Sequence, residues 1–178
     1  MDEWWKRVYW APATFLGRLL YGFAAAAVLF AAALYIGSHR PWAALSLIGT
    51  SIVLEAQPAA VASVALGFHP LTGAVISILA NLIPIPVLML SFHQIVSHWH
   101  WAKAKVQRVQ KWSDKYGRYG VGILAPLSPF LGAYVCIAIG FGTGWKPLRT
   151  LLSTLVGMVL SVFLITYAGH WIAQVFSL

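Results

Sequence analysis

Glu55 is the residue of this chain whose type and position point most directly to chemistry, because it is the only acidic residue between Glu3 and Asp114. Residues 42–67 around it carry no other charge. An ionised carboxylate in hydrocarbon is so unfavourable that such a residue usually faces a protein interior or a wet cavity, where it serves a function. Burial favours the protonated form, so Glu55 is predicted to be a proton-responsive centre in a membrane transport site.

Prolines next to polar residues predict two helix breaks inside apolar segments. Proline removes a backbone donor and disfavours helix at the residue before it. The turns are therefore expected at Glu55–Pro58 and at Pro126–Pro129. Each break frees N–H groups at the start of a new half-helix, near Ala59 and Phe130, and these groups attract anions together with the helix dipole.

Polar residues near these breaks are expected to hydrogen-bond Glu55 or a substrate. Gln57 and Ser128 belong to the breaks, and Asn81 lies midway along a neighbouring apolar segment. The predicted site for substrate and protons consists of Glu55, Gln57, Pro58, Asn81, Pro126, Ser128 and Pro129. A structural interpretation stays open, in which Glu55 ties down the freed backbone of the break and Asn81 holds a helix through an interhelical amide bond.

Composition places the chain in the membrane. It is 60% hydrophobic and 9% charged, with a mean hydropathy of +0.78, values outside the range of soluble domains. The sequence has no Ser/His/Asp arrangement, phosphate-binding loop or paired carboxylates, so neither an enzyme nor a cofactor is expected. The spacing of His93, His98 and His100 fits no standard metal site, and the single Cys136 excludes an internal disulfide.

Five apolar segments must position these residues. Three of them are long enough to cross a core of ~30 Å at ~1.5 Å per residue, and we predict full spans at 19–37, 71–92 and 148–174. The segments 42–67 and 120–144 are broken into pieces too short to cross. They are predicted to form two re-entrant hairpins that point toward each other, and complete crossing as kinked helices is the alternative.

The two broken segments, each with the span that follows it, have prolines and glycines in the same order, which predicts an internal repeat. The alignment pairs Pro58 with Pro129, Gly67 with Gly140 and Pro70 with Pro147. Interrupted helices at corresponding positions of inverted repeats mark the binding site of many transporters. The predicted fold is an all-α integral membrane protein with three full transmembrane helices and two opposed re-entrant helical hairpins that form an inverted repeat.

A single membrane domain, 1–178, is expected. Its predicted parts are an N-terminal interfacial segment with the first span (1–37), a hairpin with its span (42–92), a basic interfacial helix (98–118) and a second hairpin with its span (119–175). The expected location is the plasma membrane of a prokaryote. Basic residues favour the cytoplasmic side, which predicts a cytoplasmic N-terminus and an external C-terminus. The N-terminus is interpreted as an uncleaved anchor rather than a signal peptide.

Cytoplasmic basic residues explain the net charge of +8 better than nucleic-acid binding does. Residues predicted to attract an anionic headgroup are Lys105, Arg108, Lys146 and Arg149. Simple anchoring to anionic lipid is the alternative for this group. Small residues on the first span predict a homodimer, although the same surface could pack inside one chain; they are Ala24, Ala27, Ala31 and Ala32.

Several of these features occur in an order that resembles a known family. An acid precedes a proline-broken hairpin, and a span with Asn-Leu-Ile-Pro-Ile-Pro (Asn81–Pro86) follows. A basic stretch then ends in Lys-Tyr-Gly (Lys115–Gly117), and a Pro-x-x-Pro hairpin contains Gly132. Over residues 49–169 this order resembles the small multidrug export family, which is similar in architecture to the DedA superfamily.

The resemblance to DedA-like proteins implies opposed re-entrant hairpins and proton- or cation-driven translocation of a polyprenyl phosphate or another lipid, with Glu55 at the acidic position. DedA proteins carry Arg in the second hairpin, whereas residues 125–140 here contain no base. The leading hypothesis is a proton-coupled transporter of an anionic lipid. The alternatives are a proton-coupled exporter of small cationic drugs and a non-transporting membrane scaffold or assembly factor.

Overall fold

The computed structural model describes residues 15–89, 120–142 and 145–176, and all regular structure within them is helical. Three helices are long and apolar enough to cross a membrane. These candidate spans are Leu19–Ile36 in α2 (Phe15–Ile36), Pro70–Met89, which begins with α5 (Pro70–Leu82), and Leu148–Ile172 in α10 (Pro147–Phe176). The three predicted spans therefore coincide with helices that are long and apolar enough to cross a membrane, and the regular structure of the described residues is all-helical.

Four shorter helices lie between the spans in two pairs. The first pair is α3 (Pro41–Leu54) and α4 (Ala56–Ala65), and the second is α8 (Leu124–Leu131) and α9 (Ala133–Gly142). Each helix is shorter than the ~20 residues that a membrane crossing needs. A single residue separates the members of each pair, and in both cases it has a positive φ.

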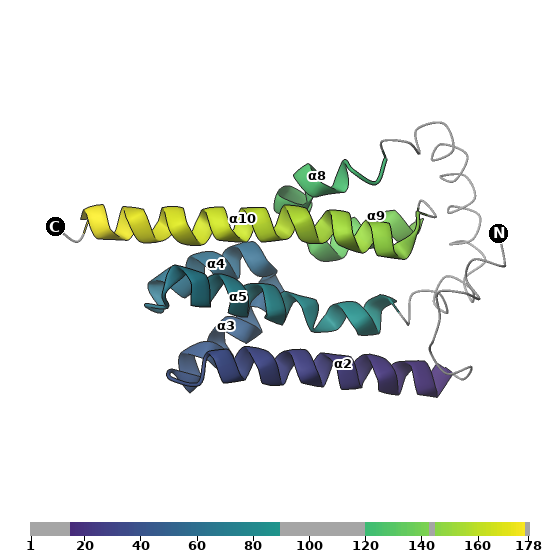
Figure 1. Cartoon of the computed structure of the whole chain (residues 1–178), viewed down its shortest axis with the longest axis horizontal. Coiled ribbons are helices and arrows are strands. Elements are labelled where there is room, and N and C mark those ends of the chain that lie inside the picture. The colour runs from purple at the N-terminus through teal and green to yellow at the C-terminus, as the bar shows by residue number, and fades with distance from the viewer. Residues whose placement is uncertain (1–14, 90–119, 143–144, 177–178) are drawn as a thin grey trace.

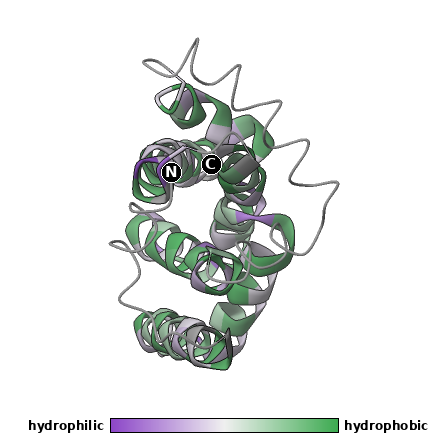
Figure 2. Cartoon of the chain, turned by 90° about the vertical axis from the view of Figure 1, so that its right-hand side faces the viewer, coloured by the Kyte–Doolittle hydropathy of each residue, from purple (hydrophilic) through white to green (hydrophobic). Residues whose placement is uncertain are grey.

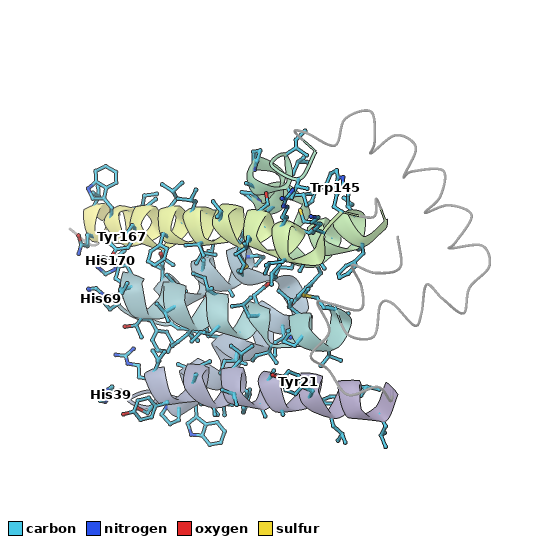
Figure 3. The ribbon with its side chains drawn as sticks, turned by 45° about the vertical axis from the view of Figure 1, so that its right-hand side comes forward. Tyr21, His39, His69, Trp145, Tyr167 and His170 are labelled. Carbon is cyan, nitrogen blue, oxygen red and sulfur yellow. The ribbon has the colours of Figure 1, made fainter. Side chains whose placement is uncertain are left out.

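The start of α3 and the end of α4 lie close together. His39 precedes α3 and His69 follows α4, and both lie at one end of the bundle (Figure 3). The Arg40 guanidinium, just before α3, donates a hydrogen bond of 3.0 Å to the carbonyl of Leu66, just after α4. Figure 1 shows α3 and α4 between that end and the middle of the bundle, and α8 and α9 between the middle and the other end.

The second helix break differs from its predicted position. The first break lies at Glu55, inside the predicted turn, but the second lies at Gly132 rather than at Pro126–Pro129, which is part of α8. Pro58 and Pro126 are each the third residue of a helix, where the N–H group has no intrahelical acceptor and proline is tolerated. Glycine adopts a positive φ without steric cost, so Gly132 makes the turn.

The starts of the half-helices also differ from those expected. α4 begins at Ala56 rather than near Ala59, and α9 begins at Ala133 rather than near Phe130. The predicted kink in the middle span is present, since α5 ends at Leu82 and the chain becomes helical again at Pro84.

α10 packs against α4, α5, α8 and α9, and α5 lies between α10 and α2 (Figure 1), while α2 also packs against α3. Small residues fill the space around the centre of the bundle, which lets the helices approach closely. One core cluster there consists of Ala56, Ala60, Ala74, Ala133, Met158 and Val162. Most of the described ribbon in Figure 2 has the colour of apolar residues, and many large apolar side chains are exposed, as expected for a protein surrounded by lipid.

The predicted interfacial helix at 98–118, with Lys105 and Arg108, and most of the N-terminal segment lie outside the described residues. The same holds for His93, His98 and His100. Lys146 and Arg149 are described, and both side chains are exposed at the start of α10.

Candidate functional site

Glu55 has an unusual backbone conformation, with φ 76° and ψ 175°. It is the only residue other than glycine with a positive φ in the described part of the chain. This region of the Ramachandran plot is essentially reserved for glycine, and a larger residue held there costs about 1–3 kcal/mol. Contacts of the surrounding structure must therefore hold Glu55 in this conformation.

The Glu55 carboxylate binds the other helix pair. Its Oε2 accepts a hydrogen bond of 2.9 Å from the backbone N–H of Ala133, the first residue of α9. Hydrogen bonds to an ionised carboxylate are stronger than neutral ones, and the start of a helix favours negative charge. The acid between α3 and α4 therefore joins the two breaks, and we call this contact the tip junction.

The partner of Glu55 differs from the predicted ones. Gln57, Asn81 and Ser128 were the expected partners, but the hydrogen bond is made by the main chain of α9. A helix that starts after a break has unpaired N–H groups, which compete well for a nearby carboxylate. The side chains of Gln57, Asn81 and Ser128 bind other backbone carbonyls instead.

Gly132 provides the space for the carboxylate. It is buried, and its φ of 84° and ψ of 161° resemble those of Glu55. A Cβ atom placed on Gly132 would overlap both carboxylate oxygens of Glu55. Sequence reasoning named Gly132 only as part of a family pattern, although a glycine inside a broken apolar segment is itself a signal for a positive φ.

Gln57 connects the first helix pair to the second. Its half-buried side chain donates a hydrogen bond of 3.3 Å from Nε2 to the carbonyl oxygen of Ser128, near the end of α8. The same Nε2 lies 3.5 Å from the Oγ of Ser161 on α10. The amide is thus a second donor to the Ser128 carbonyl, which also accepts a hydrogen bond of 2.9 Å from the N–H of Gly132.

Asn81 has a similar role at the first break. It is fully buried on α5, and its Nδ2 lies 3.5 Å from the carbonyl oxygen of Ser51, in the last turn of α3. Tyr134, the second residue of α9, donates a hydrogen bond of 3.2 Å from its hydroxyl to the carbonyl of Asn81. Tyr134 was not predicted, because only the folded chain brings α9 beside α5.

Corresponding hydrogen bonds in the two halves are separated by 77 residues, as Glu55 and Gly132 are. The Oγ of Ser51 donates to the carbonyl of Ser77 at 2.6 Å, and the Oγ of Ser128 donates to the carbonyl of Thr154 at 3.1 Å. Of the pairs aligned in the sequence, Pro70 and Pro147 have this separation and begin α5 and α10. The pairs Pro58/Pro129 and Gly67/Gly140 do not have it.

The remaining predicted site residues are the three prolines. Pro58 and Pro126 are exposed and Pro129 is half-buried, so their contribution is to the helix ends rather than to polar contacts. Among the described residues, several buried polar atoms near the junction have no hydrogen-bond partner, and they include Ser77 Oγ, Asn81 Oδ1 and Thr154 Oγ1. Unpaired buried polar groups of this kind are rare in folded proteins.

A family model described as "putative small multi-drug export protein" matches residues 55–164, which is more than half of the chain. The match begins at Glu55 and includes Gly132, Ala133 and the hydrogen-bonded residues of α5 and α10 around the tip junction. No curated protein and no solved structure matches the chain. With three helices fit to span a membrane and an acid at the junction of two broken helix pairs, the chain belongs to the small multi-drug export protein family.

Proposed function

We propose that this chain is a proton-coupled membrane transporter for an anionic lipid, with a polyprenyl phosphate as the first candidate substrate. The observation that carries the proposal is the hydrogen bond between the Glu55 carboxylate and the N–H of Ala133. A group that gains and loses a proton thereby holds together the two broken helix pairs. Family membership and the three candidate spans support transport as the general activity.

Glu55 is the proposed proton carrier, since it is the only acidic residue in the described part of the chain. The helices α3, α4, α5 and α8 carry no titratable side chain, and α9 adds Tyr134 and Cys136. The titratable residues of α10 lie toward its ends, at Arg149, Tyr167 and His170. No basic side chain of these helices is therefore placed to hold Glu55 in its ionised form.

Protonation of Glu55 weakens the tip junction. A hydrogen bond to a charged group contributes about 1.5–3 kcal/mol, whereas one between neutral groups contributes about 0.5–1.5 kcal/mol. The protonated carboxyl therefore holds the N–H of Ala133 less tightly than the carboxylate does. Uptake of a proton favours separation of the two breaks, and its release favours the closed junction.

A lipid phosphate can take the place that the carboxylate leaves. Backbone N–H groups at the start of a helix are established binding groups for phosphate, and the Glu55 contact demonstrates that an anionic oxygen fits at the start of α9. While Glu55 is ionised it occupies this position and repels a second anion. Protonation of Glu55 weakens its hold on the start of α9 and removes the repulsion of a second anion. A proton and a phosphate therefore enter together.

Alternating access requires two states, and an inverted repeat supplies them. We propose that the α3–α4 and α8–α9 pairs are re-entrant hairpins of such a repeat, related in the manner expected for DedA-like proteins. The similar dihedral angles at Glu55 and Gly132 support this proposal, as do the corresponding serine hydrogen bonds and the entry of the pairs from opposite ends of the bundle. Exposed Lys146 and Arg149 support a cytoplasmic location for the end where α10 begins.

Exchange of protons for a small cation is the second candidate function. It is favoured by one observation: within α3, α4, α8 and α9 there is an acid at the first break and no basic residue. An ionised Glu55 could then bind a cationic drug and release it on protonation. The two candidates predict opposite effects of the charge on Glu55, which makes them separable.

Substrate binding to Glu55→Gln decides between these functions. The full chain in nanodiscs is titrated with polyprenyl phosphate and with tetraphenylphosphonium at low and high pH, and Glu3→Gln serves as a control for the change in net charge. Because Gln mimics the protonated acid, the variant is expected to bind the phosphate at high pH as tightly as the unmodified protein does at low pH. Phosphate binding that is independent of both pH and Glu55 would reject the proposal, and phosphonium binding that needs ionised Glu55 would establish cation exchange.

A further inference from the structure

We infer that Glu55 and Gly132 are equivalent positions of the two halves, and that Gly132 is a positioning residue whose missing side chain admits the Glu55 carboxylate to the start of α9. The inference concerns geometry, and its consequence for proton coupling rests on the proposed function. It goes beyond that function because it assigns a role to a residue that neither binds protons nor contacts substrate through a side chain.

The backbone supports the equivalence of the two positions. Both residues lie in the region of the Ramachandran plot that glycine prefers, with φ 76° and ψ 175° at Glu55 and φ 84° and ψ 161° at Gly132. Each carbonyl also accepts the hydrogen bond that starts the following helix. The N–H of Ala59 donates to the carbonyl of Glu55 at 3.4 Å, and the N–H of Cys136 donates to that of Gly132 at 3.2 Å.

The neighbouring side chains support it as well. A serine lies four residues before each position, and its hydroxyl donates to the span that follows its helix pair. Two residues after each position, a polar side chain reaches across to a carbonyl of the other half. These side chains are Gln57 after Glu55 and Tyr134 after Gly132.

The two positions differ in the one respect that matters for chemistry. Glycine would be the less strained residue at both, yet one position carries an acid. A side chain at 132 would overlap the Glu55 carboxylate, so the junction has room for a single side chain. Gly132 is therefore required by the acid of the opposite half as well as by its own backbone conformation.

A double-mutant cycle separates these two requirements. Thermal unfolding of the full chain in detergent is measured for Gly132→Ala, Glu55→Gly and the double variant. Whether position 55 is Glu or Gly, the Gly132→Ala substitution places an alanine in a conformation with a positive φ, which costs stability. Steric overlap between the alanine Cβ and the carboxylate is added only when Glu55 is present. Gly132→Ala is therefore expected to lower the Tm by at least about 3 °C more in the presence of Glu55 than in the Glu55→Gly background.

Each result of the cycle is decisive. Failure of Gly132→Ala to fold unless Glu55 is replaced would also support the inference. Equal losses of Tm in the two backgrounds, or failure to fold in both, would overturn the positioning role. Glycine would then be needed at 132 only for its positive φ and not to make space for the Glu55 carboxylate.

Exchange of the two residues tests their equivalence. In Glu55→Gly/Gly132→Glu, the carboxylate at 132 would face the start of α4 as Glu55 now faces the start of α9. We expect Gly132→Glu alone to lose pH-dependent binding of polyprenyl phosphate and the exchanged variant to regain it. An exchanged variant that is unfolded, or folded but insensitive to pH, would overturn the equivalence. Absence of pH dependence in the unmodified protein would instead reject the proposed function, and the unfolding cycle would still decide the role of Gly132.

Discussion

At the scale of single residues, the tip junction is made by a side chain in one half and the backbone in the other. Glu55 tolerates a conformation that costs about 1–3 kcal/mol, and its carboxylate is compensated by the N–H of Ala133. Gln57, Asn81 and Tyr134 satisfy carbonyls around the breaks or on the facing helices. The strained residue is thus bound directly by α9, and the hydrogen bonds around it connect the two helix pairs with each other and with α5.

Tyr134→Phe tests the contribution of these cross-connections. The substitution removes the hydroxyl that donates to the carbonyl of Asn81 and leaves the ring in place. The net loss for such a hydrogen bond is about 1 kcal/mol, so the Tm in detergent should fall by about 2–4 °C. Tyr167→Phe, which alters an exposed residue, is the control and should leave the Tm unchanged. Equal Tm values for the two variants would show that the Tyr134 hydroxyl does not stabilise the fold.

The sequence predicted the polar residues of the site but not their hydrogen-bond partners. Glu55, Gln57, Asn81 and Ser128 stand out as polar residues in apolar surroundings, and all four make hydrogen bonds near the breaks. Their partners were not predictable because those partners are backbone groups, which every residue possesses. Only the arrangement of the folded helices selects Ala133 for Glu55.

At the scale of helices, each half packs a short helix against the following span through a very small residue. On α4, Ser63 faces Gly73 of α5, where an added Cβ would lie 2.7 Å from the Ser63 Cβ. On α9, the small residue is Gly140, and it faces Thr150 of α10. In the first half the larger residue of the contact is on the short helix, whereas in the second half it is on the span. Exchanging the larger and the smaller residue within one half should therefore be tolerated.

Gly73→Ser tests this packing. The substitution alone should lower the Tm by several degrees, since overpacking a helix contact costs about 1–3 kcal/mol. Adding Ser63→Gly should restore most of the loss, because it reproduces the arrangement of the other half. Gly49→Ser is a matched control, as a Cβ at Gly49 meets no other atom within 4 Å. A double variant as unstable as Gly73→Ser would contradict the size exchange.

Prediction at the helix scale was accurate for long apolar segments and weaker for the breaks. The three spans follow from hydropathy and length alone. The second break was misplaced because proline was taken as its marker, although proline is acceptable in the first turn of a helix, where Pro126 lies. A buried glycine with a positive φ, Gly132, makes that break instead.

At the scale of the whole molecule, the arrangement of the helix pairs determines the topology. If the α3–α4 pair is re-entrant, the chain before α3 and the chain after α4 lie on the same side of the membrane. Complete crossing would place them on opposite sides. The predicted homodimer belongs to this scale too, and Ala24, Ala27 and Ala31 remain exposed on α2, where a second copy or lipid could cover them.

Labelling of single cysteines with an impermeant reagent tests the topology. In a Cys136→Ala background, His39→Cys and His69→Cys are both exposed positions at one end of the bundle. We expect both to react from the same side in intact cells or oriented vesicles, and Lys146→Cys to react from the other side. Reaction of positions 39 and 69 from opposite sides would establish complete crossing and reject the re-entrant arrangement.

The distance between the two breaks as a function of pH tests the central claim most directly, namely that ionised Glu55 holds the tip junction closed. Spin labels at Val53→Cys and Phe130→Cys, two exposed and corresponding positions, are measured by double electron–electron resonance in the Cys136→Ala background. We expect a short, narrow distance distribution at high pH and a longer or broader one at low pH, with Glu55→Gln resembling the low-pH form at both. A distribution that does not change with pH, or that changes equally in Glu55→Gln, would contradict the account.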